Sequence, residues 1–283
     1  MNETVWLAFP VKEQIRITDM YSLFIIHHDH GYTFPREIHN FWECVYVLEG
    51  ELCVSADEKV YNLGCSEIIF HKPLELHKFT VNSAGGATLL IFSFSAEGPL
   101  TDWMRDKVFR LSENQTALIE AMLTYIQTKT ASLTLPQREK RYLVPFDHIP
   151  YYSQMVTTYL YQLFLSLSDE GTIAHVSSAP DAVTFRNAIS YLNCNLHRQP
   201  SVAEIARFSA VSEASLKRIF DKYTGISVHK YLLRLKMKAA TELLKDGESV
   251  YNVAERLGFN SQSYFSKAFK RETGVSPSEI KQA

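Results

Sequence analysis

The sequence predicts an α+β protein of several domains: an N-terminal antiparallel β-barrel, a helical middle, and a C-terminal all-α domain that uses one helical unit twice. Three observations lead to this prediction. Short runs of β-branched and aromatic residues dominate the first third, apolar residues at helical spacing replace them, and a pattern that starts at Ser201 recurs at Ser249. With 283 residues and 46% hydrophobic content, the chain is long enough for about two packed cores.

The strands are expected between Tyr21 and Ser95. "WECVYVLEGELCVS" and "ATLLIFSF" are rich in strand-forming residues, and tight turns are predicted at Glu49-Gly50, Ala56-Asp57 and Gly85-Gly86. Several such strands without a helical period between them favour an antiparallel sandwich or barrel. We therefore assign residues 1–95 to the first domain.

The helical middle is assigned to residues 96–182. Apolar residues recur at helical spacing twice, once over Leu118, Ile119, Met122, Leu123 and Ile126, and again from Tyr152 to Leu167. Residues 134–150 carry three prolines and predict a loop, and residues 168–182 are polar and small enough for a linker. Tyr152, Tyr159, Leu163 and Leu167 are expected to form core against the barrel or to pair two subunits.

The duplicated unit fills residues 183–283. "SVAEIA" at 201–206 matches "SVYNVA" at 249–254, and Leu216, Phe220 and Gly225 match Phe265, Phe269 and Gly274. Each copy predicts a short helix, a turn and a second helix, with serine caps at the starts and a left-handed glycine at the end. The first turn lacks the glycine that the second has at Gly258 and is one residue shorter.

One face of each second helix stays polar, and the domain that carries both is basic. Residues 183–283 hold 16 Lys and Arg against 9 Asp and Glu, whereas the rest of the chain is acidic. Arg and Lys can donate to guanine and Gln can pair with adenine, so the faces suit readout of DNA. The expected DNA-binding residues are Ser212, Ala214, Ser215, Lys217, Arg218, Gln262, Ser263, Tyr264, Ser266, Lys267, Lys270 and Arg271.

Residues 183–281 resemble the DNA-binding domain of the bacterial AraC/XylS transcription regulators, most specifically in "VAERLGFNSQSYFSKAFKRETGVSPSE". The resemblance implies two helix-turn-helix units joined by a long helix over about Val228 to Lys245, with both recognition helices in successive major-groove segments of a promoter. It places base contacts on Ala214, Lys217, Arg218, Gln262, Ser263 and Lys267. Lys270 and Arg271 are expected nearer phosphates, and Tyr264 is left undecided. Ala214 offers only a methyl contact.

The first domain resembles a cupin. The spacing Gly31-x5-Glu37-x-His39-x3-Glu43-x6-Gly50, followed by a segment that ends at His77, is similar to the two cupin motifs, with Glu37 in place of the usual histidine and Ser66-Glu67 in place of Gly-Asp. Such a barrel would bring its polar residues toward one interior, whose mouth is a natural pocket.

Three interpretations of the cupin residues stay open. They orient a small polar effector, for which a sugar is one candidate; or they hold a divalent metal; or they are structural. We favour an effector site formed by Arg36, Glu37, His39, Glu43, Tyr46 and His77, without a metal or other cofactor. The adjacent histidines at 27–30 point to opposite faces if extended and are expected at the surface.

The composition argues against several classes of protein. The chain does not open with a basic region followed by an apolar run, and the longest apolar stretch is far too short to cross a bilayer, so we expect a cytoplasmic protein without membrane contact. Cys44, Cys53, Cys65 and Cys194 lack CxxC spacing, which predicts reduced, mostly buried thiols and argues against a methyltransferase that needs clustered cysteines.

The sequence thus predicts a non-enzymatic transcription regulator that responds to an effector. Its expected partners are double-stranded promoter DNA, a second copy of the chain paired through the helical middle, and RNA polymerase. The alternative is a metal-dependent cupin enzyme with an accessory DNA-binding domain, which the substitution at Glu37 and the missing Gly-Asp disfavour.

Overall fold

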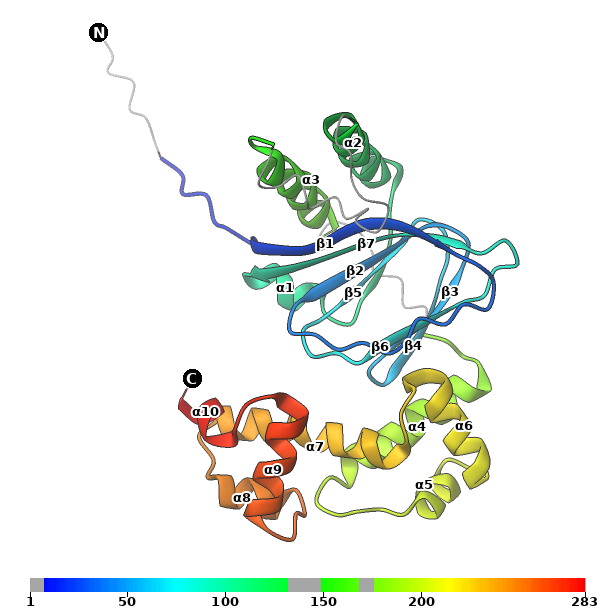
Figure 1. Cartoon of the computed structure of the whole chain (residues 1–283), viewed down its shortest axis with the longest axis vertical. Coiled ribbons are helices and arrows are strands. Elements are labelled where there is room, and N and C mark those ends of the chain that lie inside the picture. The colour runs from blue at the N-terminus through cyan, green and yellow to red at the C-terminus, as the bar shows by residue number, and fades with distance from the viewer. Residues whose placement is uncertain (1–7, 132–148, 168–175, 283) are drawn as a thin grey trace. The chain divides into compact units, whose positions relative to one another are not determined.

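The computed structural model describes residues 8–131, 149–167 and 176–282 (Figure 1). The chain divides into two compact units, one made of residues 1–54 and 61–175, the other of residues 55–60 and 176–283. In the part of the chain that the structure describes, no helix has both the length and the apolar character needed to cross a membrane.

The N-terminal unit is built on antiparallel strands. A five-stranded sheet has the order β1-β7-β2-β5-β8, and a second sheet has the order β4-β3-β6. The predicted antiparallel sheet and its turns are therefore confirmed, while closure into a barrel stays a prediction. The strands are β1 (Arg16–His28), β2 (Trp42–Glu49), β3 (Leu52–Ala56), β4 (Lys59–Leu63), β5 (Glu67–His71), β6 (His77–Val81), β7 (Ala87–Glu97) and β8 (Val108–Arg110).

Two helices, α2 (Glu113–Thr130) and α3 (Tyr152–Leu167), lie beside each other on the side of β1 and β7 (Figure 1). The Phe164 ring of α3 lies 5.6 Å from Phe70 of β5 and 5.2 Å from Phe94 of β7. Because strand side chains alternate, every second residue of β2 joins this core and the others face away from it. The sheet thus has one face covered by helices and one face left for a pocket.

The predicted domain boundaries need correction. The predicted boundary after residue 95 falls inside β7. The sheet also continues beyond β7, because the strand β8, which follows the short helix α1 (Pro99–Met104), pairs with β5 at Ile69↔Val108. Three residues of β8 are too few to show an alternating pattern. The boundary after residue 182 falls inside α4 (Pro180–Cys194).

Other predictions in this region have mixed outcomes. The predicted loop at 134–150 and the linker at 168–182 lie mostly outside the described residues. None of the four cysteines, all of which lie in the described part of the chain, forms a disulfide. Only Cys44 is buried, Cys53 is half-buried, and Cys65 and Cys194 are exposed, so the expectation of mostly buried thiols is wrong.

The C-terminal unit is helical, as predicted, and its helix starts follow the serine signals. Ser201, Ser212, Ser249 and Ser261 each accept a hydrogen bond from the backbone N–H three residues later. The predicted long helix over Val228 to Lys245 is confirmed as α7. The helices are α4 (Pro180–Cys194), α5 (Val202–Phe208), α6 (Glu213–Thr224), α7 (Val228–Lys245), α8 (Val250–Arg256), α9 (Gln262–Thr273) and α10 (Pro277–Gln282).

The two turns share one backbone form although their sequences differ. Gly258 has a φ of 66°, and Ala210, its counterpart in the first copy, has a φ of 56°. In both copies the next residue donates its N–H to the alanine carbonyl of the preceding helix, Val211 to Ala206 at 3.0 Å and Phe259 to Ala254 at 2.9 Å. Alanine adopts this left-handed form at a cost that glycine avoids.

Helix α7 is shared by both copies. Near its start, the Tyr231 ring packs 5.5 Å from Phe220 of α6. Near its end, Met237, Ala240 and Leu244 join the core formed by α8 and α9 with Phe265 and Phe269. One continuous helix therefore joins the two helix-turn-helix copies within the C-terminal unit.

Candidate DNA-binding surface and ligand pocket

The predicted base-reading residues lie on exposed faces of α6 and α9. Leu216, Ile219 and Phe220 bury one side of α6, and Phe265, Ala268 and Phe269 bury one side of α9. This division by helical phase leaves the opposite sides polar. Ala214, Lys217, Arg218, Gln262, Ser263 and Lys267 are exposed, as are Ser212, Tyr264, Lys270 and Arg271, while Ser215 and Ser266 are half-buried.

The predicted DNA-binding residues of α9 form two groups, those that line a neighbouring groove and those that do not. Tyr264, which is 58% exposed, and Arg271 line a groove of about 560 Å³ between α7 and α9. Gln262, Ser263, Lys267 and Lys270 do not line it. Tyr264 and Arg271 are seven residues apart and so share one face of the helix.

This groove contains residues that the sequence interpretation missed. Gln199, His229 and Lys230 line it together with Tyr264 and Arg271. His229 and Lys230 are exposed and lie between the buried positions Val228 and Tyr231 at the start of α7. That pattern in "VHKY" is the signal that could have identified them, because it marks the outer face of the long helix.

A buried lysine supports the second turn. Lys236 of α7 is 2% exposed, and its Nζ donates to the carbonyl of Leu257 at 2.8 Å and lies 5.2 Å from the Phe259 ring centre. Burial lowers the pKa of Lys236. The side chain ties the connecting helix to the turn that sets the direction of α9.

The N-terminal unit contains a pocket of about 410 Å³ on the sheet face that the helices leave open. Its walls come from β1, β2, β6 and β7 and from the segment before β2. Aromatic side chains dominate, and the polar groups are few, which is typical of small-molecule sites. The lining residues include Tyr21, Phe24, Tyr32, Phe34, Phe41 and Phe79, with Ser22, Glu37, His39, Glu43 and Ser93.

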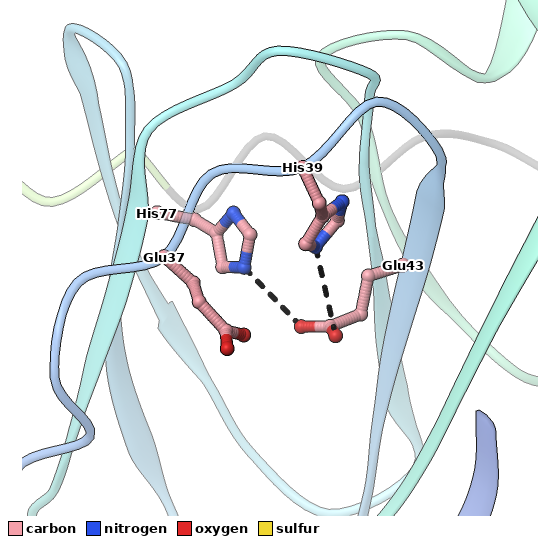
Figure 2. Close-up of side chains that lie close together, drawn as sticks. All are labelled: Glu37, His39, Glu43 and His77. Carbon is pink, nitrogen blue, oxygen red and sulfur yellow. Dashed lines mark ion pairs between the residues drawn. The ribbon is translucent and has the colours of Figure 1, made fainter. Parts of the chain in front are cut away.

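Four of the predicted site residues meet beside this pocket, and three of them, Glu37, His39 and Glu43, line it. Glu37, His39, Glu43 and His77 each offer one ligand atom, and these atoms lie within 4.8 Å of one another (Figure 2). Glu43 Oε2 is 3.7 Å from His39 Nε2, and Glu43 Oε1 is 3.3 Å from His77 Nε2. The backbones of Glu37 and His77 are paired by N–H···O bonds of 3.0 and 3.2 Å.

The electrostatics of the cluster follow from burial and proximity. Burial acts to raise the pKa of Glu43, but His39 and His77 beside it hold that pKa well below the usual range. Burial acts to lower the pKa of His39, yet the hydrogen bond and charge of Glu43 raise it overall. Burial, with His77 next to it, keeps the pKa of His71 well below its ordinary value.

Two predicted effector residues do not join the cluster. Tyr46 is three residues after Glu43 in β2 and therefore points to the other face, where it is buried in the core with the helices. This corrects the expectation that Tyr46 orients a ligand. Arg36 is exposed and is not among the residues that line the pocket. His27 and His30 are exposed, as expected for their segment, and His28 is half-buried.

Known protein families match both units. Residues 20–106 match the AraC-like ligand binding domain, and residues 205–283 match a helix-turn-helix domain. The chain is 29% identical over 254 residues to the HTH-type transcriptional regulator YidL of Escherichia coli, covering 86% of this chain and 76% of that protein. It is 25% identical over 263 residues to the Msm operon regulatory protein of Streptococcus mutans, covering 89% and 88%.

Among solved structures, a transcriptional regulator of Chromobacterium violaceum with an AraC-type DNA-binding domain is 28% identical, with a TM-score of 0.34, covering 35% of this chain and 89% of that one. The family matches and the relatives agree with the repeated helix pairs and the sheet pocket, and they support a regulator over the alternative of a cupin enzyme. The chain thus joins an N-terminal AraC-like ligand binding domain to a C-terminal helix-turn-helix domain, the combination expected of an AraC-type DNA-binding transcription regulator.

Proposed function

We propose that α6 and α9 read base edges in two successive major-groove segments of a promoter, and that a small molecule in the N-terminal pocket controls this binding. The observation that carries the proposal is the repetition of one exposed polar face on two capped helices held by the shared helix α7. A rigid connection of this kind suits two contacts at a fixed spacing on one side of the DNA.

Individual roles follow from side-chain chemistry. Lys217, Arg218 and Lys267 donate to guanine O6 and N7 or to neighbouring acceptors, and Gln262 pairs with adenine. Ala214 and Ser263 allow close approach to the groove. Lys270 and the groove residues Arg271, Lys230 and His229 contact phosphates, which fixes the register without reading sequence.

The effector site is the 410 Å³ pocket. Its volume and its aromatic walls suit a compact molecule, and Glu37, His39, Glu43 and His77 supply polar contacts at one end. An effector that bears hydroxyl groups, such as a sugar, fits this combination of flat apolar surfaces and hydrogen-bonding groups. An effector that binds one arrangement of the protein more tightly than another would shift the protein toward that arrangement and so change promoter occupancy.

The remaining assignments concern partners. The protein acts in the cytoplasm as a homodimer and contacts RNA polymerase, and it has no enzymatic activity. Support for pairing through the helical middle is that α3 buries Tyr152, Leu163 and Leu167 against the sheet but leaves Met155 38% exposed and Leu165 44% exposed. Apolar side chains exposed on a helix are available for an interface.

Mapping of the full-length protein on bacterial DNA tests the proposal. We expect occupancy at promoters and, in vitro, an affinity that falls steeply with salt, with a log–log slope of about −0.9 for each phosphate contacted. A thermal-shift screen of small sugars and polar acids should then yield a compound that stabilises the protein and changes occupancy. Binding away from promoters, or without salt dependence, would contradict the assignment to DNA readout.

A further inference from the structure

We propose that Lys236 is a positioning residue for α9, which sets the orientation of that helix and so controls base readout at one of the two DNA segments but not at the other. Lys236 lies in the middle of α7 and acts through the turn between α8 and α9. The inference rests on the proposed base readout by α9 and deepens it, because it names the side chain on which the geometry of that readout depends.

The side chain of Lys236 ends at the turn. Its Nζ donates a hydrogen bond of 2.8 Å to the carbonyl oxygen of Leu257, the C-cap residue of α8. The same atom lies 5.2 Å from the centre of the Phe259 ring, which is the range of a cation–π contact. The Phe259 ring in turn packs 5.2 Å from that of Phe265, on the buried face of α9. One ammonium group therefore connects α7 with the end of α8 and with the turn residue that packs on α9.

Packing alone does not explain a lysine at this position. Lys236 is 2% exposed and makes no ion pair with any residue that the structure describes; Glu272, the acidic residue of the same groove, pairs with Arg271 at 3.1 Å instead. Burial of an ammonium group without a carboxylate costs free energy, and it lowers the pKa of Lys236. An apolar side chain of the same length would avoid that cost. What the lysine adds is a directed hydrogen bond to one carbonyl group, which fixes an orientation that apolar packing leaves open.

The rest of the turn is also fixed, so a change at Lys236 is passed on to α9. Gly258 lies against the backbone of His197, where a Cβ would be 2.1 Å from the carbonyl oxygen. Ser261 then caps α9 with its side chain. Gln262 and Ser263, the first two residues of α9, follow directly, and both are expected to meet bases. A binding site of this kind needs its side chains placed to within about 0.5 Å, so a small rotation at the turn is enough to lose the contacts.

The first helix-turn-helix copy has no equivalent of this contact. The serines that cap α5 and α8, Ser201 and Ser249, are 48 positions apart, and 48 positions before Lys236 stands Ala188 of α4, which is buried and has no side-chain donor. The first turn has Ala210 in the left-handed form that a glycine adopts in the second turn. Alanine restricts the backbone more than glycine does, so the second turn has a freedom that Lys236 removes. Loss of Lys236 should therefore affect α9 and leave α6 in place.

Binding of full-length variants to DNA tests the proposal. The probe is a duplex that the wild-type protein selects from a random-sequence library, and Arg218→Ala and Gln262→Ala identify the segments read by α6 and α9 through the base preference that each variant loses. Lys236→Met removes the charge and the donor and keeps a side chain of similar length. Base changes in the α9 segment that weaken wild-type binding about tenfold should weaken Lys236→Met less than about threefold, while the effect of base changes in the α6 segment should be the same in both proteins.

Two further variants separate positioning from other effects. Lys236→Arg should restore most of the preference in the α9 segment, because a guanidinium group is able to donate to the Leu257 carbonyl and to lie over the Phe259 ring. Lys245→Met is the matched control, since it removes one positive charge from an exposed position of the same helix, and it should keep both preferences. A merely structural role of Lys236 would weaken binding to every duplex alike.

Unchanged preference in the α9 segment of Lys236→Met, or equal loss of preference in both segments, would overturn the proposal. So would a loss of the α9 preference in Lys245→Met. Lys236→Gln, which is neutral and shorter, takes the place of Lys236→Met if circular dichroism shows that the latter does not fold.

Hydrogen exchange without DNA distinguishes a failure of this proposal from a failure of the proposed function. If the wild-type protein selects no duplex, the proposed readout of DNA fails, and exchange alone then decides whether Lys236 fixes the turn. Amides of residues 258–264 should exchange at least about fivefold faster in Lys236→Met than in the wild-type protein, whereas those of residues 210–215 should not change. Equal exchange of residues 258–264 in the two proteins would contradict the role of Lys236.

Discussion

Replacing Gly258 by alanine should destabilise the C-terminal unit through two separable effects. Gly258 has a φ of 66°, a left-handed form that costs an alanine about 1 kcal/mol or somewhat more. A Cβ at this position would also lie 2.1 Å from the carbonyl oxygen of His197 and 2.6 Å from its carbon, so the α4–α5 loop must move by about 1 Å. Overpacking of backbone adds about 1 to 3 kcal/mol, for a total of about 2 to 4 kcal/mol.

Gly274→Ala is the matched control. Gly274 has a φ of 83°, but a Cβ there has nothing within 4 Å among the described residues, so only the backbone cost of about 1 kcal/mol applies. For a unit of about 100 residues, Gly258→Ala should lower the melting temperature by about 10 to 20 °C and Gly274→Ala by about 5 °C.

The two units can be followed separately in the full-length protein. All three tryptophans, Trp6, Trp42 and Trp103, belong to the N-terminal unit, so their fluorescence reports the sheet domain. The helical signal in circular dichroism comes largely from α4 to α10. We expect the circular dichroism transition to shift and the fluorescence transition to stay. Equal shifts for Gly258→Ala and Gly274→Ala would refute the contact with His197 as the cause.

Two further predictions concern single side chains. Arg218→Ala and Lys267→Ala should each weaken binding to the operator by about 1 to 3 kcal/mol and relax the base preference at one position, as measured by binding to a set of operator variants; a uniform loss on all sequences would assign them to phosphates instead. Hydrogen bonds from Arg198, at 2.6 Å, and from Tyr191, at 2.5 Å, lower the pKa of Glu204 to about 2 from its usual 4.5. This carboxylate therefore stabilises the folded state above about pH 4.5, and the contribution disappears as the pH falls toward 2. Glu204→Gln should lower the melting temperature near neutral pH, with a difference from wild type that vanishes near pH 2; a difference independent of pH would argue against the charged pair.

The sequence determined the local structure of the C-terminal unit almost completely. Helix boundaries there follow from serine caps, glycine ends and the helical spacing of Leu216, Phe220, Phe265 and Phe269, all of which act over a few residues. Because the unit is repeated, the same helix boundaries could be predicted independently in both copies. The same local signals divided α9 into a buried face and an exposed face, as the structure has it.

The features that the sequence did not predict depend on contacts between segments that are far apart in the chain. Glu204, three residues after the N-cap Ser201, does not bond back to the helix start, because its carboxylate turns to Arg198 and Tyr191. The groove shared by Tyr264 and His229 exists only because α7 and α9 pack together.

The ligand pocket shows the same division between sequence and tertiary structure. The motif spacing indicated that Glu37, His39, Glu43 and His77 belong together, and the strand period alone would have placed Tyr46 on the opposite face from Glu43. No local pattern states that the Nε2 atoms of His39 and His77 both face Glu43, or that their other nitrogens meet the carbonyls of Phe41 and Glu75. Those facts depend on how the segment before β2 lies against β6, a pairing between residues about 40 positions apart, which only the tertiary structure decides.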